Sequence, residues 1–220
     1  MKIVKPSVEI ITNIDGNQIL KSIELAARTC YKTEEKITEG PESAIKMIEK
    51  LIEMDHTAML EFADVHVRIV SDTGFLKDIT RMRISSFAAE STRWCNYSKG
   101  KFNSELTFIE PINIKPDTPE YMIWYKTMKE IEESYMKMSQ LGCKPDQMRM
   151  ILPHSTKTEV NIKTNIREWR HIFSLRCHKA AHPSVRQVML ETLRLFHKKI
   201  PVLFDDLYET FKEDILSNSL

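Results

Sequence analysis

Hydrophobic and polar positions change their spacing several times along the chain, and each change predicts a different element. Residues 3–12 and 63–71 alternate at a period of two, which is typical of strands with one buried face. Residues 16–32 and 41–54 place apolar side chains three and four apart, which predicts amphipathic helices. The further elements are a short helix over 73–82 capped by Asp72 or Thr73, a loop to about residue 104, a strand at 105–110, a helix at 117–141, a strand at 156–163, helices at 165–178 and 184–198, and a last helix opened by Pro201.

This order of elements predicts a mixed α+β fold with few strands and several long helices. The sequence contains no repeat, no low-complexity tract and no linker rich in Pro, Gly or Ser. Residues 1–220 are therefore expected to form a single domain.

Composition narrows the classes of function. The formal net charge is only +1, so no overall basic field would attract nucleic acid, and any anion site must be a local cluster. Five isolated glycines form neither GxGxxG nor a P-loop, so side chains must supply much of any phosphate site. The four cysteines lack CxxC spacing, and no apolar run approaches a signal peptide or a membrane span, so a reduced, cytoplasmic protein is expected.

Residues 81–93, RMRISSFAAESTR, form the first segment with candidate chemistry. This segment holds three arginines and four hydroxyl residues against a single acid. A planar guanidinium grips phosphate through paired hydrogen bonds, and serine or threonine adds short donors. The segment therefore predicts a phosphate site built without glycine, and the alternative is a solvated basic loop with surface ion pairs.

Residues 165–176, NIREWRHIFSLR, form the second candidate segment. Positions three and four apart share one helical face, so Asn165, Trp169, Ile172 and Arg176 form a largely apolar stripe. A guanidinium cannot escape burial by losing its proton, so Arg176 requires a carboxylate, a phosphate or a developing anion. The alternatives are pairing with a structural Asp or Glu, or a side chain that extends to water.

Two other kinds of site have weak support. His178 and His182 have the spacing of two ligands on one helical turn, but no Glu follows the first as in HExxH. Pro183 is also expected to begin a new helix there, so no metal site is predicted. The GxSxG motif of many serine hydrolases is missing from the sequence.

The ordered segments resemble the flavin-dependent thymidylate synthases. That family's signature RHRxxSxxxxSxR reads RMRISSFAAESTR here, and the following WCNYSKGKF is similar to members that continue STRYCNYS. Upstream, His56 to Glu61 resembles HxxxxEH. Downstream, MRMILP and then NIREWRHIFSLR resemble ARxxLP and NxRxxxHFLxLR. The likeness spans about residues 15–208, and several motifs in order are more specific than any one of them.

The resemblance implies a small, mostly antiparallel sheet and a homotetramer whose active sites form between subunits. It implies FAD as the prosthetic group, NADPH as its reductant, and methylenetetrahydrofolate as the carbon donor that converts dUMP to dTMP. The expected partners are then small molecules, and binding to nucleic acid or to a membrane is not expected.

The same resemblance assigns the site residues by position. Arg176 is the expected catalytic residue, because a fixed cation beside the N3/O2 edge of uracil stabilises negative charge while carbon 5 attacks an electrophilic methylene. Ser91 is assigned to substrate binding, since no adjacent His or Lys in the sequence would activate it. The expected dUMP contacts are Asp78, Arg81, Ala89, Glu90, Ser91, Thr92, Arg93, Arg149 and Arg176. The expected FAD contacts are Arg81, Met82, Arg83, Asn165, Arg167 and His171.

Four departures from the family pattern bear on activity. They are Met82 and Phe62 in place of histidines, Ala58 in place of a hydroxyl residue, and Asp78 in place of glutamine. Met82 is in line with Phe75 and Ile79 on the predicted short helix, so it is expected to pack. These departures are compatible with four alternatives to the usual activity. The protein could bind flavin weakly, use a different electron donor, form a hydroxymethyl product, or bind the nucleotide without catalysis.

A different class of function is single-stranded nucleic-acid binding. Phe87, Trp94 and Tyr97 lie among basic residues between positions 81 and 101, and such rings stack on bases. The near-zero net charge argues against this class.

Overall fold

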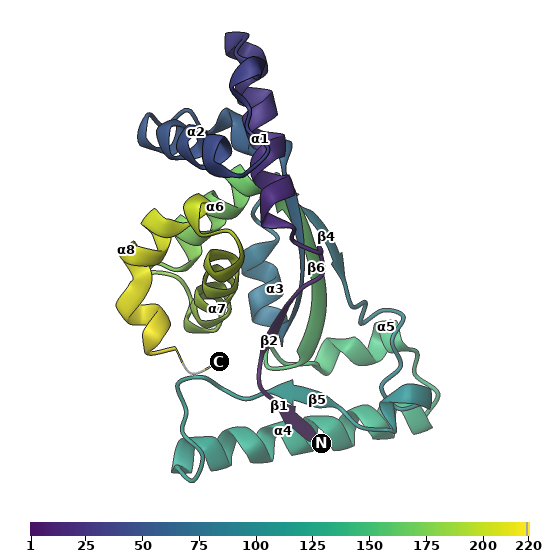
Figure 1. Ribbon diagram of the computed structural model, residues 1–220. Helices are drawn as coiled ribbons and strands as arrows, with labels where there is room; N and C mark the ends of the chain where they lie inside the picture. Colours follow the sequence, from purple (N-terminus) through teal and green to yellow (C-terminus); the bar gives the residue numbers. More distant parts are fainter. Residues whose placement is uncertain (219) are drawn as a thin grey trace.

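The computed structural model describes residues 1–218 and 220. Figure 1 shows the course of the chain. The elements in order are β1 (Lys2–Val4), β2 (Ser7–Ile10), α1 (Gly16–Tyr31), α2 (Glu42–Glu53), β3 (Asp64–Asp72), α3 (Thr73–Ile79), β4 (Ser86–Ala89), β5 (Thr107–Ile109), α4 (Pro119–Gln140), α5 (Pro145–Met148), β6 (Lys157–Asn165), α6 (Ile166–Arg176), α7 (Pro183–Lys199) and α8 (Asp205–Leu216). Short 3-10 segments include η2 (Thr57–Phe62), η4 (Arg149–Ile151) and η5 (Pro201–Leu203).

Four strands form an antiparallel sheet in the order β2-β3-β6-β4. β3 and β6 pair along their whole length, from Asp64 opposite Asn165 to Asp72 opposite Lys157. β1 belongs to a separate pair, in which it runs parallel to β5. The predicted mixed α+β fold with a small, mostly antiparallel sheet is therefore confirmed.

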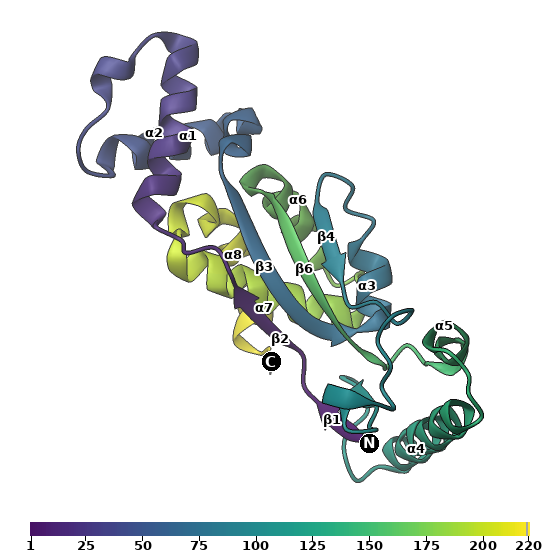
Figure 2. The ribbon, with the colours of Figure 1, turned by 90° about the vertical axis from the view of Figure 1, so that its right-hand side faces the viewer.

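The larger sheet has one buried face and one open face. Val65, Val67 and Ile69 of β3, and Val160 and Ile162 of β6, are completely buried. Helices α3, α6 and α7 lie on this side of the sheet, and Figure 2 shows the strands from the opposite side with α7 behind them. Because a slip of one residue would turn these apolar side chains outward, burial fixes the register of the two long strands.

Helix α3 begins as predicted but ends earlier than predicted. The Asp72 carboxylate accepts a hydrogen bond from the backbone N–H of Phe75 at 2.7 Å and caps the first turn. The predicted end at residue 82 is wrong, because α3 ends at Ile79 and a turn follows. Met82 nevertheless packs with Phe75 and Ile79 in the core and is only 5% exposed, as its spacing predicts.

Three other boundaries differ from the sequence prediction. The predicted strand over 3–12 is divided into β1 and β2, with Pro6 between them, and each part joins a different sheet. Proline lacks the N–H that a continuous strand would donate. The predicted loop before residue 104 contains β4, which pairs with β6. Pro201 opens the short η5, and the last helix begins at Asp205.

A second, smaller core lies beside α4. Its buried members are Tyr97, Leu106, Phe108, Met128, Tyr135 and Met148. They come from the segment after β4, from β5 and its neighbourhood, and from α4 and α5, so this cluster holds these elements together. Among the described residues, none of the helices is both long enough and apolar enough to cross a bilayer.

The main core contains an aromatic cluster that provides a stability test. Phe196 is completely buried and lies 5.1, 5.4 and 5.3 Å, between ring centroids, from Trp169, Phe173 and Phe204. Phe196→Ala should lower the free energy of unfolding by about 3–5 kcal/mol, measured by urea denaturation, because it leaves a cavity. Leu216→Ala is the control, since Leu216 is 72% exposed, and it should change stability by about 0.5 kcal/mol or less. A loss below about 1 kcal/mol at Phe196 would contradict this description of the core.

Candidate functional site

Apart from Arg176, the arginines of the chain divide into two groups according to their partners. Those that form ion pairs with carboxylates are Arg28, Arg68, Arg167, Arg170, Arg186 and Arg194. Within the described part of the chain, the exposed side chains of Arg81, Arg83, Arg93 and Arg149 have no ion pair or hydrogen bond. The sequence has 31 acidic residues, so these guanidiniums are unpaired despite an ample supply of carboxylates.

These unpaired arginines favour the phosphate interpretation of residues 81–93. The alternative is a solvated basic loop with surface ion pairs. The arginines are exposed, but among the described residues they do not form those ion pairs. Arg93 instead lies over the ring of Trp94, with 5.3 Å between the guanidinium carbon and the ring centroid. Unpaired guanidiniums keep their full set of donors for a ligand oxyanion.

The unpaired arginines do not all lie at one place within the chain. Arg81 and Arg83 are in the turn that precedes β4, whereas Arg93 follows the other end of that strand, and Arg149 begins η4. Four residues of strand span about 13 Å, which is more than one phosphate group can bridge. A single copy of the chain therefore presents its exposed, unpaired arginines in at least two separate places.

Arg176 occupies a half-buried position at the end of α6. One Nη donates to the backbone carbonyl of Asp78 at 3.0 Å and lies 3.8 Å from the Met82 sulfur. Nε is buried and has no hydrogen-bond partner among the residues that the structure describes. A neutral backbone carbonyl therefore orients Arg176, whereas the sequence predicts a carboxylate, a phosphate or a developing anion as its partner. The positive charge itself still lacks a compensating anion, which is the condition that would favour a negatively charged ligand.

The stripe predicted on α6 is present. Trp169 and Ile172 are completely buried, and Asn165 caps the helix by accepting from the N–H of Glu168 at 2.8 Å. The Trp169 indole N–H donates to the carbonyl of Val65 at 3.0 Å, which joins α6 to β3. These contacts fix the helix along its length and so position Arg176 at its end.

Asp78 lies beside Arg176 and also lines a cavity of about 430 Å³. The wall of this cavity includes Lys77 and His154, whose Nζ and Nε2 atoms are 2.9 Å apart. The half-buried Asp78 side chain makes no hydrogen bond with another described residue. Asp78 is thus next to Arg176, and its negative charge stands where the family signature commonly has glutamine.

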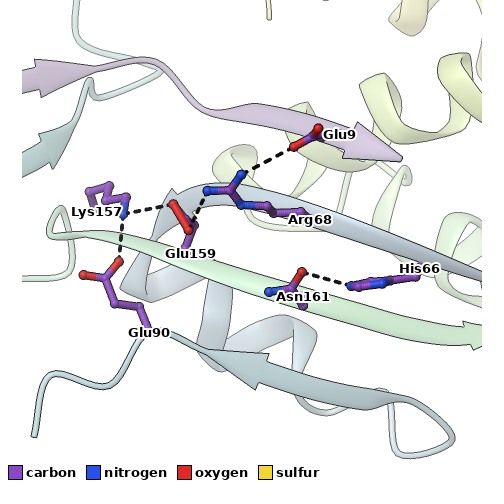
Figure 3. Close-up of polar contacts among 7 residues, drawn as sticks. All are labelled: Glu9, His66, Arg68, Glu90, Lys157, Glu159 and Asn161. Atoms are coloured by element: carbon purple, nitrogen blue, oxygen red, sulfur yellow. Dashed lines mark hydrogen bonds and ion pairs between the residues drawn. The ribbon is translucent and has the colours of Figure 1, made fainter. Parts of the chain in front are cut away.

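The segment Ala89–Arg93 begins at the last residue of β4, and Glu90 makes two side-chain hydrogen bonds there. The Glu90 carboxylate accepts from Lys157 Nζ at 2.7 Å and from the Tyr97 hydroxyl at 2.9 Å; Figure 3 shows the contact with Lys157. Burial and the neighbouring charge of Glu90 raise the pKa of Tyr97 well above its ordinary value, which keeps the hydroxyl a donor. Ser91 and Arg93 have exposed side chains, and Thr92 is half-buried.

Lys157 and Tyr97 were absent from the expected site, although the sequence contained a signal for one of them. Lys157 falls on the outward positions of the alternating strand that includes Glu159 and Asn161, so its presence on the open face could have been inferred. Its partner Glu90 directly follows β4, a strand that the sequence pattern did not predict. The contact between Tyr97 and Glu90 could not be inferred in this way, because it depends on how the second core packs.

A second cleft, of about 590 Å³, lies at the beginning of α6. Its wall includes Asn165, Arg167 and His171, and the Arg167 guanidinium is 2.6 Å from the Glu61 carboxylate. The structure thus brings the segment from His56 to Glu61 together with the NxRxxxH segment, although they are far apart in the sequence. The imidazole and the guanidinium are donors of the kind that phosphates and flavin carbonyls accept, so this donor set fits FAD.

The expected FAD contacts are consequently found in two places. Asn165, Arg167 and His171 line the cleft, whereas the side chain of Met82 is buried in the core against Arg176. Ile84, two residues further on, does reach the wall of the cleft. The turn that carries Arg81 and Arg83 therefore borders the cleft, but Met82 faces away into the protein.

His178 and His182, whose spacing would suit two metal ligands, each contact a residue two positions further along the chain. His178 Nδ1 accepts from the N–H of Ala180 at 3.2 Å, and His182 Nδ1 is 2.9 Å from the Ser184 hydroxyl. His182 is also the residue that caps α7. These contacts account for both rings in structural terms.

Proteins of known sequence and structure resemble this chain over most of its length. The flavin-dependent thymidylate synthase of Corynebacterium glutamicum is 26% identical over 216 residues, which cover 90% of this chain and 83% of the relative. The enzyme of the same name from Pyrococcus furiosus is 29% identical over 187 residues, which cover 82% of this chain and 75% of the relative.

A solved structure with the same fold is the UMP/dUMP methylase PolB from Streptomyces cacaoi, bound with 5-Br dUMP. It aligns with a TM-score of 0.74 at 19% identity and covers 96% of this chain and 98% of PolB. The profile of the Thy1 family, described as thymidylate synthase complementing protein, matches residues 12–202. Because this match covers most of the chain, including the signature segment and Arg176, the chain belongs to the Thy1 family.

Proposed function

We propose that this chain is a flavin-dependent thymidylate synthase, which converts dUMP to dTMP by reductive methylation of carbon 5 of the uracil ring. The observation that carries the proposal is the set of exposed arginines without carboxylate partners: Arg81, Arg83, Arg93 and Arg149. A nucleotide and a dinucleotide cofactor both provide the phosphates that such guanidiniums bind. Membership of the Thy1 family and the named relatives support the same activity.

In this proposal Arg176 acts on the pyrimidine. A uracil ring is a poor nucleophile until negative charge on its N3/O2 edge is stabilised, and a preorganised cation provides that stabilisation at little cost in reorganisation. The hydrogen bond to the Asp78 carbonyl already fixes one side of the guanidinium. The half-buried guanidinium has no carboxylate partner among the described residues, so binding of the ionised ring would compensate its positive charge.

The cleft at the beginning of α6 is the proposed FAD site, with Asn165, Arg167 and His171 as contacts and Arg81 and Arg83 at its border. The flavin, when bound, supplies the reducing equivalents that convert a transferred methylene into a methyl group. We propose methylenetetrahydrofolate as the carbon donor and NADPH as the source of the electrons, which balances the two-electron reduction. Ala89, Ser91, Thr92, Arg93 and Arg149 are the proposed contacts with dUMP.

We also propose that the active protein is a homotetramer with sites between subunits. The support is the separation of Arg81 and Arg83 from Arg93 by the length of β4, which a second copy of the chain would overcome by bringing its own loop to the site. The cytoplasm is the proposed location. All four cysteines are unpaired thiols, in agreement with a reducing compartment.

The direct test is an anaerobic incubation of the purified protein with dUMP, methylenetetrahydrofolate, FAD and NADPH, with products identified by mass. We expect dTMP, and we expect the purified protein to be yellow and to release FAD on denaturation. UMP in a parallel reaction measures the selectivity for deoxyribose. A hydroxymethylated nucleotide would preserve the site and change the reaction, whereas binding of dUMP and FAD without any product would contradict the proposed activity.

A substitution at Arg176 tests the assigned chemistry. Arg176→Ala should retain bound FAD while turnover falls by a factor on the order of 10²–10³, because the cation that stabilises the developing charge is removed. Arg194→Ala is the matched control, since that arginine is 45% exposed and pairs with Glu191 on the outer surface of α7. Near-normal turnover of the Arg176 variant would exclude the assigned role, and loss of turnover in the control would indicate a general effect of removing arginine.

A further inference from the structure

A row of alternating charges crosses the open face of the sheet and ends at the signature loop. It joins Glu9 to Arg68 at 3.5 Å, Arg68 to Glu159 at 2.8 Å, Glu159 to Lys157 at 3.4 Å, and Lys157 to Glu90 at 2.7 Å. Figure 3 shows this row passing from β2 over β3 and β6 to the residue that follows β4. The row therefore connects β2, β3 and β6 to Glu90, at the start of the segment that carries Ser91 and Arg93.

Solvent exposure decreases along the row toward the loop. The Glu9 and Arg68 side chains are 63% and 43% exposed, whereas Lys157 and Glu90 are 22% and 12% exposed. Exposed ion pairs contribute little because water screens them, while sheltered, hydrogen-bonded pairs are screened less. The strongest restraint in the row is therefore at Glu90.

Glu159 is held in its ionised form in the middle of the row. Burial alone would raise the pKa of Glu159, but the hydrogen bond from Arg68 and the charge of Lys157 outweigh that effect and lower it. The ionised carboxylate keeps the Lys157 ammonium between two negative groups. Lys157 is thus restrained on both sides and cannot easily leave Glu90.

Tyr97 approaches Glu90 from the other side. Its ring is only 5% exposed. It packs edge-on against Phe102 and at a tilt against Tyr135, with ring centroids 4.9 Å and 6.0 Å apart, respectively. The hydroxyl that donates to Glu90 is therefore held in place by the second core. Glu90 joins this core to the charged row on the sheet.

We propose that Glu90, Lys157 and Tyr97, here called the Glu90 anchor, are positioning residues that hold Ser91–Arg93 in place to bind the phosphate of dUMP. Between Glu90 and Tyr97 the loop turns tightly, because the N–H groups of Trp94 and Cys95 both donate to the Ser91 carbonyl. The Glu90 N–H also donates to the Glu159 carbonyl at 2.8 Å. The loop is fixed at both ends, while the side chains of Ser91 and Arg93 remain exposed to a ligand.

This role differs from the direct dUMP contact expected for Glu90. Its carboxylate is already occupied by two donors, and a second anion beside a phosphate would weaken binding. Holding the loop in advance has the opposite effect, since less conformational freedom is lost when the ligand binds. The inference rests on the proposed function only in naming dUMP as the ligand.

The test uses the FAD-loaded, full-length protein and three substitutions. Tyr97→Phe removes the hydroxyl and keeps the ring, Lys157→Met removes the ammonium, and Glu9→Gln alters the exposed end of the same row as a control. The measurements are the Kd of dUMP by calorimetry, amide hydrogen exchange of residues 91–96, flavin content, and kcat with its KM for dUMP. Lys157→Arg keeps the positive charge and serves as the rescue variant.

We expect Tyr97→Phe and Lys157→Met each to raise the Kd of dUMP about three- to ten-fold, as removal of one hydrogen bond does. Amide exchange of residues 91–96 should accelerate in both, while flavin content and kcat at saturating dUMP remain unchanged. Glu9→Gln and Lys157→Arg should behave as the unaltered protein.

Two results would overturn the inference. One is an unchanged Kd in both variants, whether or not the loop exchanges faster. The other is a loss of flavin and of kcat without any change in the loop, which would indicate a purely structural role. If the unaltered protein did not bind dUMP while the variants still loosened residues 91–96, the proposed function would fail and the Glu90 anchor would be supported as the restraint on the loop.

Discussion

The full-length pairing of β3 with β6, buried on one face and open on the other, is the constraint on which the rest of the structure depends. Each of these strands leads directly into a helix, α3 after Asp72 and α6 after Asn165. Because the strands are antiparallel, the two helices start at opposite ends of the sheet and return beneath it. Eleven residues of α6, about 16 Å of helix, are enough to bring Arg176 to the end of α3, where it meets the carbonyl of Asp78.

The two faces of the same sheet carry different kinds of side chain. Apolar side chains under the sheet exclude water and fix the helices, and the outer face carries the charged row that ends at Glu90. In a chain with a net charge of only +1, most arginines are neutralised by nearby acids. The arginines without a carboxylate partner are concentrated on the segments that match the family signature. The candidate site is therefore marked by which arginines lack a carboxylate partner, and the total charge of the chain does not reveal it.

Local signals in the sequence predicted much of this arrangement. The period-two strands, the Asp72 cap and the apolar stripe of α6 depend on neighbouring residues, and all are present. β4 was not predicted because its short, alanine-containing sequence has little strand propensity of its own and depends on pairing with β6. The carbonyl partner of Arg176 and the occupied carboxylate of Glu90 were also beyond prediction, since both contacts join residues far apart in the sequence. The departure at Met82 has a simple physical outcome, because the side chain packs in the core.

The central claim is that one nucleotide site is formed beside the flavin, with Arg176 and the signature loop as its parts. The most direct measurement is the visible absorption spectrum of the bound flavin during titration with dUMP, compared with titration with inorganic phosphate. The claim predicts a saturable shift of the flavin bands with dUMP, because the pyrimidine enters the environment of the isoalloxazine ring, and no such shift with phosphate alone. A protein that binds dUMP tightly while its flavin spectrum stays unchanged would contradict the claim, since nucleotide and cofactor would then occupy unrelated sites.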